Sequence, residues 1–104
     1  MKKQKKIGDK YYDVSVIGFG CAPIGGYDYG FVDKKNSIKA IKQAWESGVN
    51  FFDLSDIYGF GNAEIIIAAS LGKNCKDAII CSKFGLRKNN SGKVVIEFNN
   101  VDQF

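Results

Sequence analysis

The stretch 48–61, GVNFFDLSDIYGFG, decides how the rest of this chain can be arranged. Its apolar start, Val49–Phe52, has the length and composition of a short buried strand, and the strand ends at Asp53. A carboxylate at the end of a buried strand is costly unless a partner pairs with it. In parallel α/β sheets, this carboxyl edge is also where ligands bind. We therefore predict a functional site at Asp53, with Lys83 as its partner.

A second apolar run, Ala78–Ser82, ends at Lys83 in the same way. Its nearly continuous apolar character is typical of a strand that is buried on both faces of a parallel sheet. Because side chains alternate along a strand, Phe51 and Asp53 share one face of the first strand, and Cys81 and Lys83 share one face of the second. We expect the two charged side chains to meet at the carboxyl edge.

Two helices are predicted around these strands. Asp33 is a typical N-cap for a helix over Lys34–Ser47, and Gly48 is a typical end for it. The apolar side chains of this helix, Trp45 among them, fall on one stripe that faces the sheet. We therefore interpret Trp45 as a core residue.

The second helix is expected over Ala63–Leu71, with Asn62 as its cap and Gly72 at its end. The run Ile65–Ile67 is apolar almost all round, which indicates a helix buried between the sheet and a neighbour. Glu64 lies near the positive end of the helix dipole, and we interpret it as structural.

The two ends of the chain read as hairpins. Residues 8–10 form the first turn, and 14–19 then run into the first strand of the sheet. Polar residues 87–93 form a second turn, followed by a short strand over 94–98. Asn99 or Asn100 is then expected to cap a helix that starts at 101–104. The aromatic loop 27–32 either lines a substrate pocket or packs on the surface.

The composition excludes several classes of function. A chain of 104 residues is one small domain, and its net charge of +4 comes from the lysines at positions 2, 3, 5 and 6, which we interpret as a solvated tail. No aromatic residues interleave with these lysines, so we do not expect nucleic-acid binding. No apolar run approaches a membrane span, and no signal peptide is recognisable, so we expect no membrane association.

The cysteines indicate a reducing compartment. Cys21, Cys75 and Cys81 are odd in number and form no CxxC pair, and we expect a cytoplasmic protein. The sequence contains no histidine, so we predict no metal site. The glycines of 18–26 match neither the Rossmann nor the Walker pattern, which disfavours a small nucleotide-binding domain.

Several separated motifs resemble the aldo-keto reductase family. That family carries a strand ending in Asp, a Tyr five residues later, and a Lys in a Thr-Lys-Phe-Gly-type run, and here these are Asp53, Tyr58 and Lys83. The segment VSVIGFGCAPIGG, at 14–26, resembles the first strand and loop of the family. The sequence departs from the family at Leu54 and Ser55, where Thr and Ala are usual, and at Ser82, which replaces Thr.

The resemblance implies an α/β fold, namely an incomplete (β/α)8 barrel of the TIM type. Such a barrel needs roughly 250 residues, so this chain holds the N-terminal hairpin and about the first three β/α units. Residues 1–13 are then the basic N-terminal tail and the start of the hairpin, and residues 14–104 the partial barrel. We expect the open barrel edge to favour self-association.

The resemblance also implies the reduction of a carbonyl compound (an aldehyde, ketone or sugar) by NADPH. A phenol has an unperturbed pKa of about 10, and a neighbouring ammonium stabilises its ionised form. Lys83 is expected to activate Tyr58 in this way, while Asp53 keeps Lys83 charged and oriented. Asp53 and the backbone of Gly20, Cys21 and Ala22 are expected to lie against the nicotinamide.

A different function also fits the sequence. The family uses a downstream histidine to polarise the carbonyl, and this chain has none. The phosphate site of such barrels lies in loops around strands seven and eight, which this chain does not reach. The alternative is therefore a non-catalytic barrel fragment, or a regulatory or interaction module derived from the family.

Overall fold

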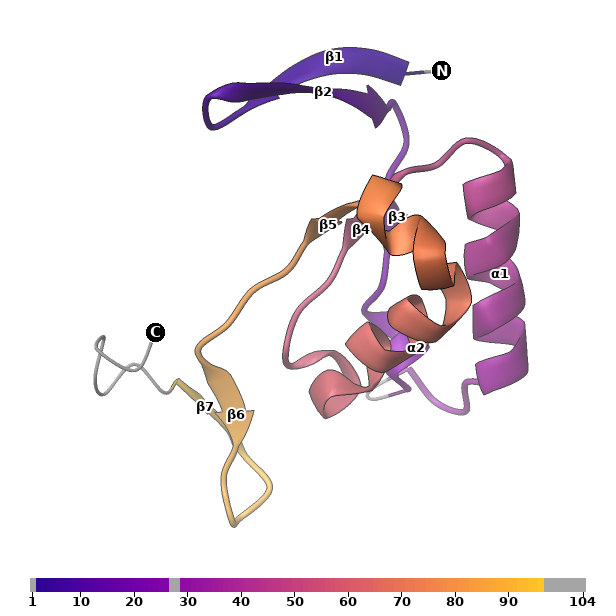
Figure 1. Ribbon diagram of the computed structural model, residues 1–104. Helices are drawn as coiled ribbons and strands as arrows, with labels where there is room; N and C mark the ends of the chain where they lie inside the picture. Colours follow the sequence, from indigo (N-terminus) through magenta and orange to yellow (C-terminus); the bar gives the residue numbers. More distant parts are fainter. Residues whose placement is uncertain (1, 27–28, 97–104) are drawn as a thin grey trace.

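Strand β4 (Phe51–Asp53) is the central strand of a three-stranded parallel sheet, between β3 (Phe19–Gly20) and β5 (Ile79–Cys81). The computed structural model describes residues 2–26 and 29–96. The predicted parallel pairing is confirmed. Within the described residues, the sheet is open and does not close into a barrel (Figure 1).

The sheet register aligns the residues at its carboxyl edge. Gly20 pairs with Asp53 on one side, and Cys81 pairs with Asp53 on the other. Phe52 faces the helices and is fully buried, whereas Phe51 on the opposite face is only half-buried and Cys81 is exposed. The prediction of strands buried on both faces is therefore wrong, because the described helices cover one face only.

Helix α1 (Lys34–Glu46) begins where its sequence predicts and ends one residue before the predicted end, with Ser47 as its C-cap. The carboxylate of Asp33 accepts a hydrogen bond from the Lys35 backbone N–H at 2.9 Å, which satisfies one of the free donors of the first turn. The Trp45 ring centroid lies 6.5 Å from that of Phe52. Trp45 is partly buried and packs against the core, as expected.

Helix α2 (Asn62–Leu71) differs from its prediction at its start. The N-cap is Gly61, and the Asn62 side chain instead donates a hydrogen bond to the Gly25 carbonyl oxygen at 3.3 Å. The helix is not buried all round either, because Ile65 is 63% exposed. Its neighbours in the run, Ile66 and Ile67, are buried against the sheet and α1.

The N-terminal lysines form a strand, which corrects the prediction of a solvated tail. Strand β1 (Lys2–Ile7) pairs in antiparallel fashion with β2 (Lys10–Ser15), and the lysine side chains are exposed. Asn50 anchors this hairpin, since its side chain accepts from the Ser15 N–H and donates to the Asp13 carbonyl, both at 2.8 Å. The chain therefore leaves β2 at Ser15, and the strand predicted over 14–19 is interrupted.

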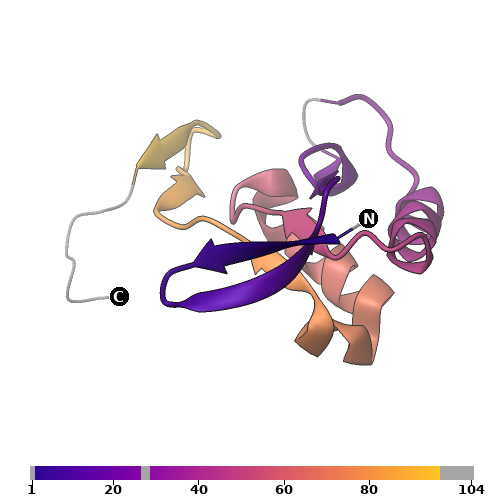
Figure 2. The same cartoon turned by 90° about the horizontal axis from the view of Figure 1, so that it is seen from above.

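A second hairpin follows the sheet. Strands β6 (Leu86–Lys88) and β7 (Val94–Ile96) pair in antiparallel fashion, as predicted. Both hairpins project away from the helices (Figures 1 and 2). The predicted helix start at 99–104 lies outside the described residues, as do positions 27 and 28 of the aromatic loop. In the rest of that loop, Phe31 is 95% exposed.

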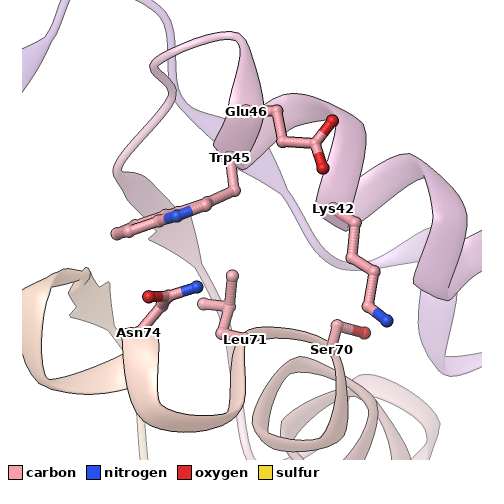
Figure 3. A pocket seen from close by; sticks show the side chains of 6 residues that line it. All are labelled: Lys42, Trp45, Glu46, Ser70, Leu71 and Asn74. Atoms are coloured by element: carbon pink, nitrogen blue, oxygen red, sulfur yellow. The ribbon is translucent and has the colours of Figure 1, made fainter.

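The core lies between the covered face of the sheet and the two helices. A cavity of about 230 Å³ opens on the outer side, between α1 and the C-terminal end of α2 (Figure 3). The Trp45 indole extends over Leu71 and Asn74 in its wall (Figure 3). No helix in the described part of the chain is both long and apolar enough to cross a bilayer. The buried apolar residues are Cys21, Ile24, Ile41, Phe52, Leu54, Ala63, Ile66, Ile67 and Leu71.

Candidate active site

Asp53 and Lys83 form an ion pair at the carboxyl edge of the sheet, as the sequence predicts. The Lys83 Nζ lies 2.8 Å from Asp53 Oδ1, and each side chain is 48% exposed. The same ammonium donates to the Leu54 carbonyl oxygen at 2.6 Å. The hydrogen bond to the Asp53 carboxylate raises the pKa of Lys83 above its ordinary value. Burial opposes this rise, and individually weaker interactions with Tyr58 add to it.

The sheet register explains why this pair forms. Asp53 is paired with Cys81 on the neighbouring strand, and Lys83 follows Cys81 by two residues. A spacing of two residues keeps Lys83 on the same face as Cys81 and Asp53, while parallel strands bring both carboxyl ends to one edge. Two charges that are 30 residues apart in sequence therefore meet.

Tyr58 lies next to the ion pair. The Lys83 Nζ is 5.2 Å from the centre of the Tyr58 ring, within the range of a cation–π contact. Ser55, itself 1% exposed, positions the turn, since its carbonyl oxygen accepts from the Tyr58 N–H at 3.2 Å. The structure thus brings Asp53, Tyr58 and Lys83 together.

A close backbone crossing, which sequence reasoning missed, also fixes the turn of Tyr58. A Cβ atom added at Gly25 would lie 2.5 Å from the Gly59 nitrogen and 2.7 Å from the Tyr58 carbonyl carbon. Only a residue without a side chain fits at Gly25. The glycines at 25–26 and 59–61 are visible in the sequence, but nothing in their spacing shows that the two loops touch.

The segment 20–22 lies at the same edge of the sheet, and its three residues differ in how far they are exposed. Gly20 is exposed, and the position of its missing Cβ is open. The Cys21 thiol is fully buried, and burial, followed by the nearby Asp53 carboxylate, raises its pKa to about 12. Ala22 is half-buried at the start of a 3₁₀ turn over Pro23–Gly25. A ligand at this edge would therefore meet backbone and not the thiol.

Two further residues brace the segment that carries Lys83. The Ser82 hydroxyl donates to the Glu64 carboxylate at 2.7 Å, which is consistent with the structural role expected for Glu64. The Asp56 N–H donates to the Lys83 carbonyl oxygen at 3.4 Å, and the Asp56 carboxylate accepts from the Leu86 N–H at 3.3 Å. Sequence reasoning did not single out Asp56. In the sequence, its position between Asp53 and Tyr58 is the feature that indicates a place near the site.

The described residues offer no cluster of three or more cysteine, aspartate and glutamate side chains that could hold a metal ion. The chemical capacity of the site is instead that of an ammonium held beside a phenol. Such a pair can donate a proton and then stabilise the anion that remains.

Comparison with known proteins identifies the family of this chain. The family model described as "Aldo/keto reductase family" matches residues 16–100. This chain belongs to the aldo/keto reductase family. It is 33% identical over 82 residues to "Probable aldo-keto reductase 1" of Glycine max, and 36% identical over 87 residues to "Aldo-keto reductase YhdN" of Bacillus subtilis. These alignments cover 78% and 81% of this chain, but only 24% and 26% of the relatives.

Solved structures resemble the fold over most of this chain. The holo form of the aldo-keto reductase AKR11C1 from Bacillus halodurans superposes with a TM-score of 0.74 at 25% identity. The glycerol dehydrogenase AKR11B4 from Gluconobacter oxydans gives the same TM-score at 28% identity. They cover 93% and 90% of this chain, and 31% and 30% of their own chains. The chain thus corresponds to less than a third of each.

Proposed function

We propose that this chain carries the proton-donating part of the active site of an NADPH-dependent carbonyl reductase. The substrate is an aldehyde, a ketone or a sugar. The observation that carries the proposal is the cluster of Asp53, Tyr58 and Lys83, with an ion pair of 2.8 Å and an ammonium 5.2 Å from the Tyr58 ring centre. The match to a family of oxidoreductases supports it. The described elements then form the first units of a (β/α)8 barrel.

Each residue of the cluster has a distinct role. The Tyr58 hydroxyl donates a proton to the oxygen of the carbonyl group as that oxygen gains negative charge. The Lys83 ammonium stabilises the phenolate that Tyr58 leaves behind. The carboxylate of Asp53 holds Lys83 in its charged form and fixes the direction of its side chain. When bound, the nicotinamide supplies the hydride.

The residues at the edge of the sheet fit the nicotinamide end of the cofactor. Gly20 leaves open space where other residues would carry a Cβ, so a flat ring can approach the backbone. Asp53, in the next strand, is half-exposed and can face the same ring. The buried Cys21 thiol takes no part, and only its backbone and that of Ala22 line the edge. The absence of disulfides among the cysteines suits a cytoplasmic enzyme.

A non-catalytic role is the second candidate. The sequence has no histidine, and the chain spans about a quarter of the length of its relatives. A fold alone does not fix function, so a protein of this family can keep the fold without the activity.

Replacement of Tyr58 by Phe distinguishes the two candidates. The variant keeps the ring and its contact with Lys83, and loses only the hydroxyl. In the protein complemented with a C-terminal reductase fragment, we expect the rate of reduction of a generic aldehyde to fall by about 10²–10⁴-fold. NADPH affinity, measured by fluorescence titration, should stay nearly unchanged. Lys83→Met should also lose activity.

Tyr11→Phe is the matched control, because Tyr11 lies on the exposed hairpin. It should leave the rate unchanged. If Tyr58→Phe reduces the aldehyde at the wild-type rate, the assignment of Tyr58 as proton donor is wrong. Complemented protein that binds NADPH but reduces no carbonyl compound would favour the non-catalytic role.

A further inference from the structure

The cavity between α1 and α2 contains no residue of the candidate active site. Its volume is about 230 Å³, and none of Asp53, Tyr58 and Lys83 lines it. Pockets for drug-sized ligands typically measure about 300–1,000 Å³, so this cavity suits a smaller molecule. The lining residues are Lys42, Trp45, Glu46, Ser70, Leu71 and Asn74 (Figure 3).

The apolar part of the cavity wall comes from Trp45 and Leu71. Trp45 is partly buried, and Leu71 is only 4% exposed. The Ser70 hydroxyl beside them donates to the Ile66 carbonyl oxygen at 2.6 Å, so its proton is already used within the protein. The wall therefore offers an indole ring and a leucine side chain to a small apolar group.

Two opposite charges also line this cavity. Lys42 and Glu46 lie four residues apart on α1, so their side chains are neighbours on one face of the helix. The lysine precedes the glutamate, which is the less favourable order for an ion pair within a helix. Both side chains are exposed, and neither has an ion-pair partner among the residues that the structure describes. In Figure 3, the Lys42 side chain extends toward Ser70, and the Glu46 carboxylate does not follow it.

The position of Glu46 is unfavourable as it stands. Glu46 is the last residue of α1, where the helix dipole has its negative end. No basic residue lies in the last turn of this helix to compensate. A cationic group bound beside Glu46 would therefore interact favourably with both the carboxylate and the end of the helix. The Lys42 ammonium, about one turn earlier, is available to a carboxylate in the same way.

We propose that this cavity binds a free α-amino acid with an apolar side chain. The ammonium group of the amino acid pairs with Glu46, its carboxylate pairs with Lys42, and its side chain packs against Trp45 and Leu71. The charges of the wall cancel, which matches a ligand whose own charges cancel. A simple anion would be repelled by Glu46, and a simple cation by Lys42. This binding function goes beyond the proposed carbonyl reduction and does not depend on it.

The test uses the fluorescence of Trp45, which is the only tryptophan of the chain and lines the cavity. The full chain is titrated with leucine and with two molecules that each lack one of its charged groups. These are 3-methylbutylamine, which has no carboxylate, and 4-methylpentanoate, which has no ammonium. The same titrations of N-acetyltryptophanamide correct for direct quenching of the indole.

We expect leucine to bind with a Kd on the order of 1–10 mM, because contacts with exposed charges are individually weak. Each of the two analogues should bind about 2–5-fold more weakly than leucine, since each loses one ion pair. Both preferences should shrink as salt is added. Glycine, which has both charges and no apolar side chain, should also bind more weakly than leucine.

Charge variants of α1 identify the two contacts separately. Lys42→Gln should remove the preference for leucine over 3-methylbutylamine and keep the preference over 4-methylpentanoate, and Glu46→Gln should do the reverse. Lys39→Gln is the matched control and should keep both preferences, because Lys39 is an exposed lysine of the same helix outside the cavity wall. The preference that each variant retains shows that its cavity is intact, so a failure to fold cannot imitate the expected result.

Three results would overturn the inference. The first is a Trp45 fluorescence that does not respond to leucine at concentrations about tenfold above the expected Kd. The second is an affinity for either analogue or for glycine that equals the affinity for leucine. The third is a pair of preferences that Lys42→Gln and Glu46→Gln leave unchanged, or that Lys39→Gln reduces as much as they do.

Discussion

Gly25→Ala tests whether the position of Tyr58 depends on the crossing of two loops. The new methyl group would lie 2.5 Å from the Gly59 nitrogen, 2.7 Å from the Tyr58 carbonyl carbon and 2.9 Å from the Gly59 Cα. These separations are roughly 0.5–0.9 Å shorter than an ordinary contact of 3.4 Å. All three partners are backbone atoms, so no side-chain rotation relieves the overlap. The loops must therefore move apart.

The cost of this substitution is steric. Gly25 does not lie in the left-handed region, so alanine can adopt its backbone conformation. Overpacking of a well-packed region destabilises by about 1–3 kcal/mol. Urea unfolding of the chain, followed by Trp45 fluorescence at one fixed protein concentration, should show this loss. With a slope of about 1–3 kcal/mol/M, the midpoint should fall by about 0.3–3 M.

Gly20→Ala is the matched control for stability, because a Cβ at Gly20 meets nothing within 4 Å. Its stability should be unchanged, or higher by up to about 1 kcal/mol from the reduced entropy of the unfolded chain. A Gly25→Ala variant with the midpoint of the wild type would refute the reasoning. It would show that the crossing of the loops at Gly25 is loose and does not position Tyr58.

Three further predictions follow from the site and the open sheet. Because the pKa of Lys83 is raised, its ion pair with Asp53 contributes stability that is complete below pH 10.5 and is lost as the pH rises through the higher value of the folded state. The pair is half-exposed, so its contribution should stay below about 1 kcal/mol. The free energies of unfolding of wild type and Lys83→Met, measured in urea, should therefore converge at high pH. A difference that stays constant with pH would contradict this. Iodoacetamide at pH 8 should modify the exposed Cys81 in the folded chain and Cys21 only after unfolding, as mapped by mass spectrometry; rapid modification of Cys21 in the folded chain would show that it is not buried. Sedimentation should show a mass that rises with concentration, and Ile80→Lys should reduce this rise, because Ile80 is 40% exposed at the sheet edge; a single-chain mass at every concentration would contradict self-association.

The candidate site was predictable to the extent that it follows from strand geometry. Asp53 and Lys83 each end an apolar run, and the alternation of side chains places them on one face of adjacent parallel strands. Their separation of 2.8 Å is a consequence of that register. The supporting contacts of Asp56 and Glu64 were not predictable, because each depends on how a loop or helix packs against the segment around Lys83.

The sequence alone determined the parallel β-α-β order, the start of α1 at Asp33, the hairpin β6–β7 and the pairing of Asp53 with Lys83. These features depend on local patterns, namely periodicity, capping residues and turn residues, which act over a few neighbouring positions. Only the tertiary structure decided that Asn62 binds Gly25 and does not cap its own helix, that the N-terminal lysines lie in a strand, and that segments 56–60 and 86–88 line one cavity. Asn62 and Gly25, like the two segments that line the cavity, are distant in sequence, and their meeting depends on how the loops pack, which no local pattern encodes. The lysine strand pairs with its neighbour β2, but its nearly unbroken run of polar residues lacks the apolar alternation that would predict a strand.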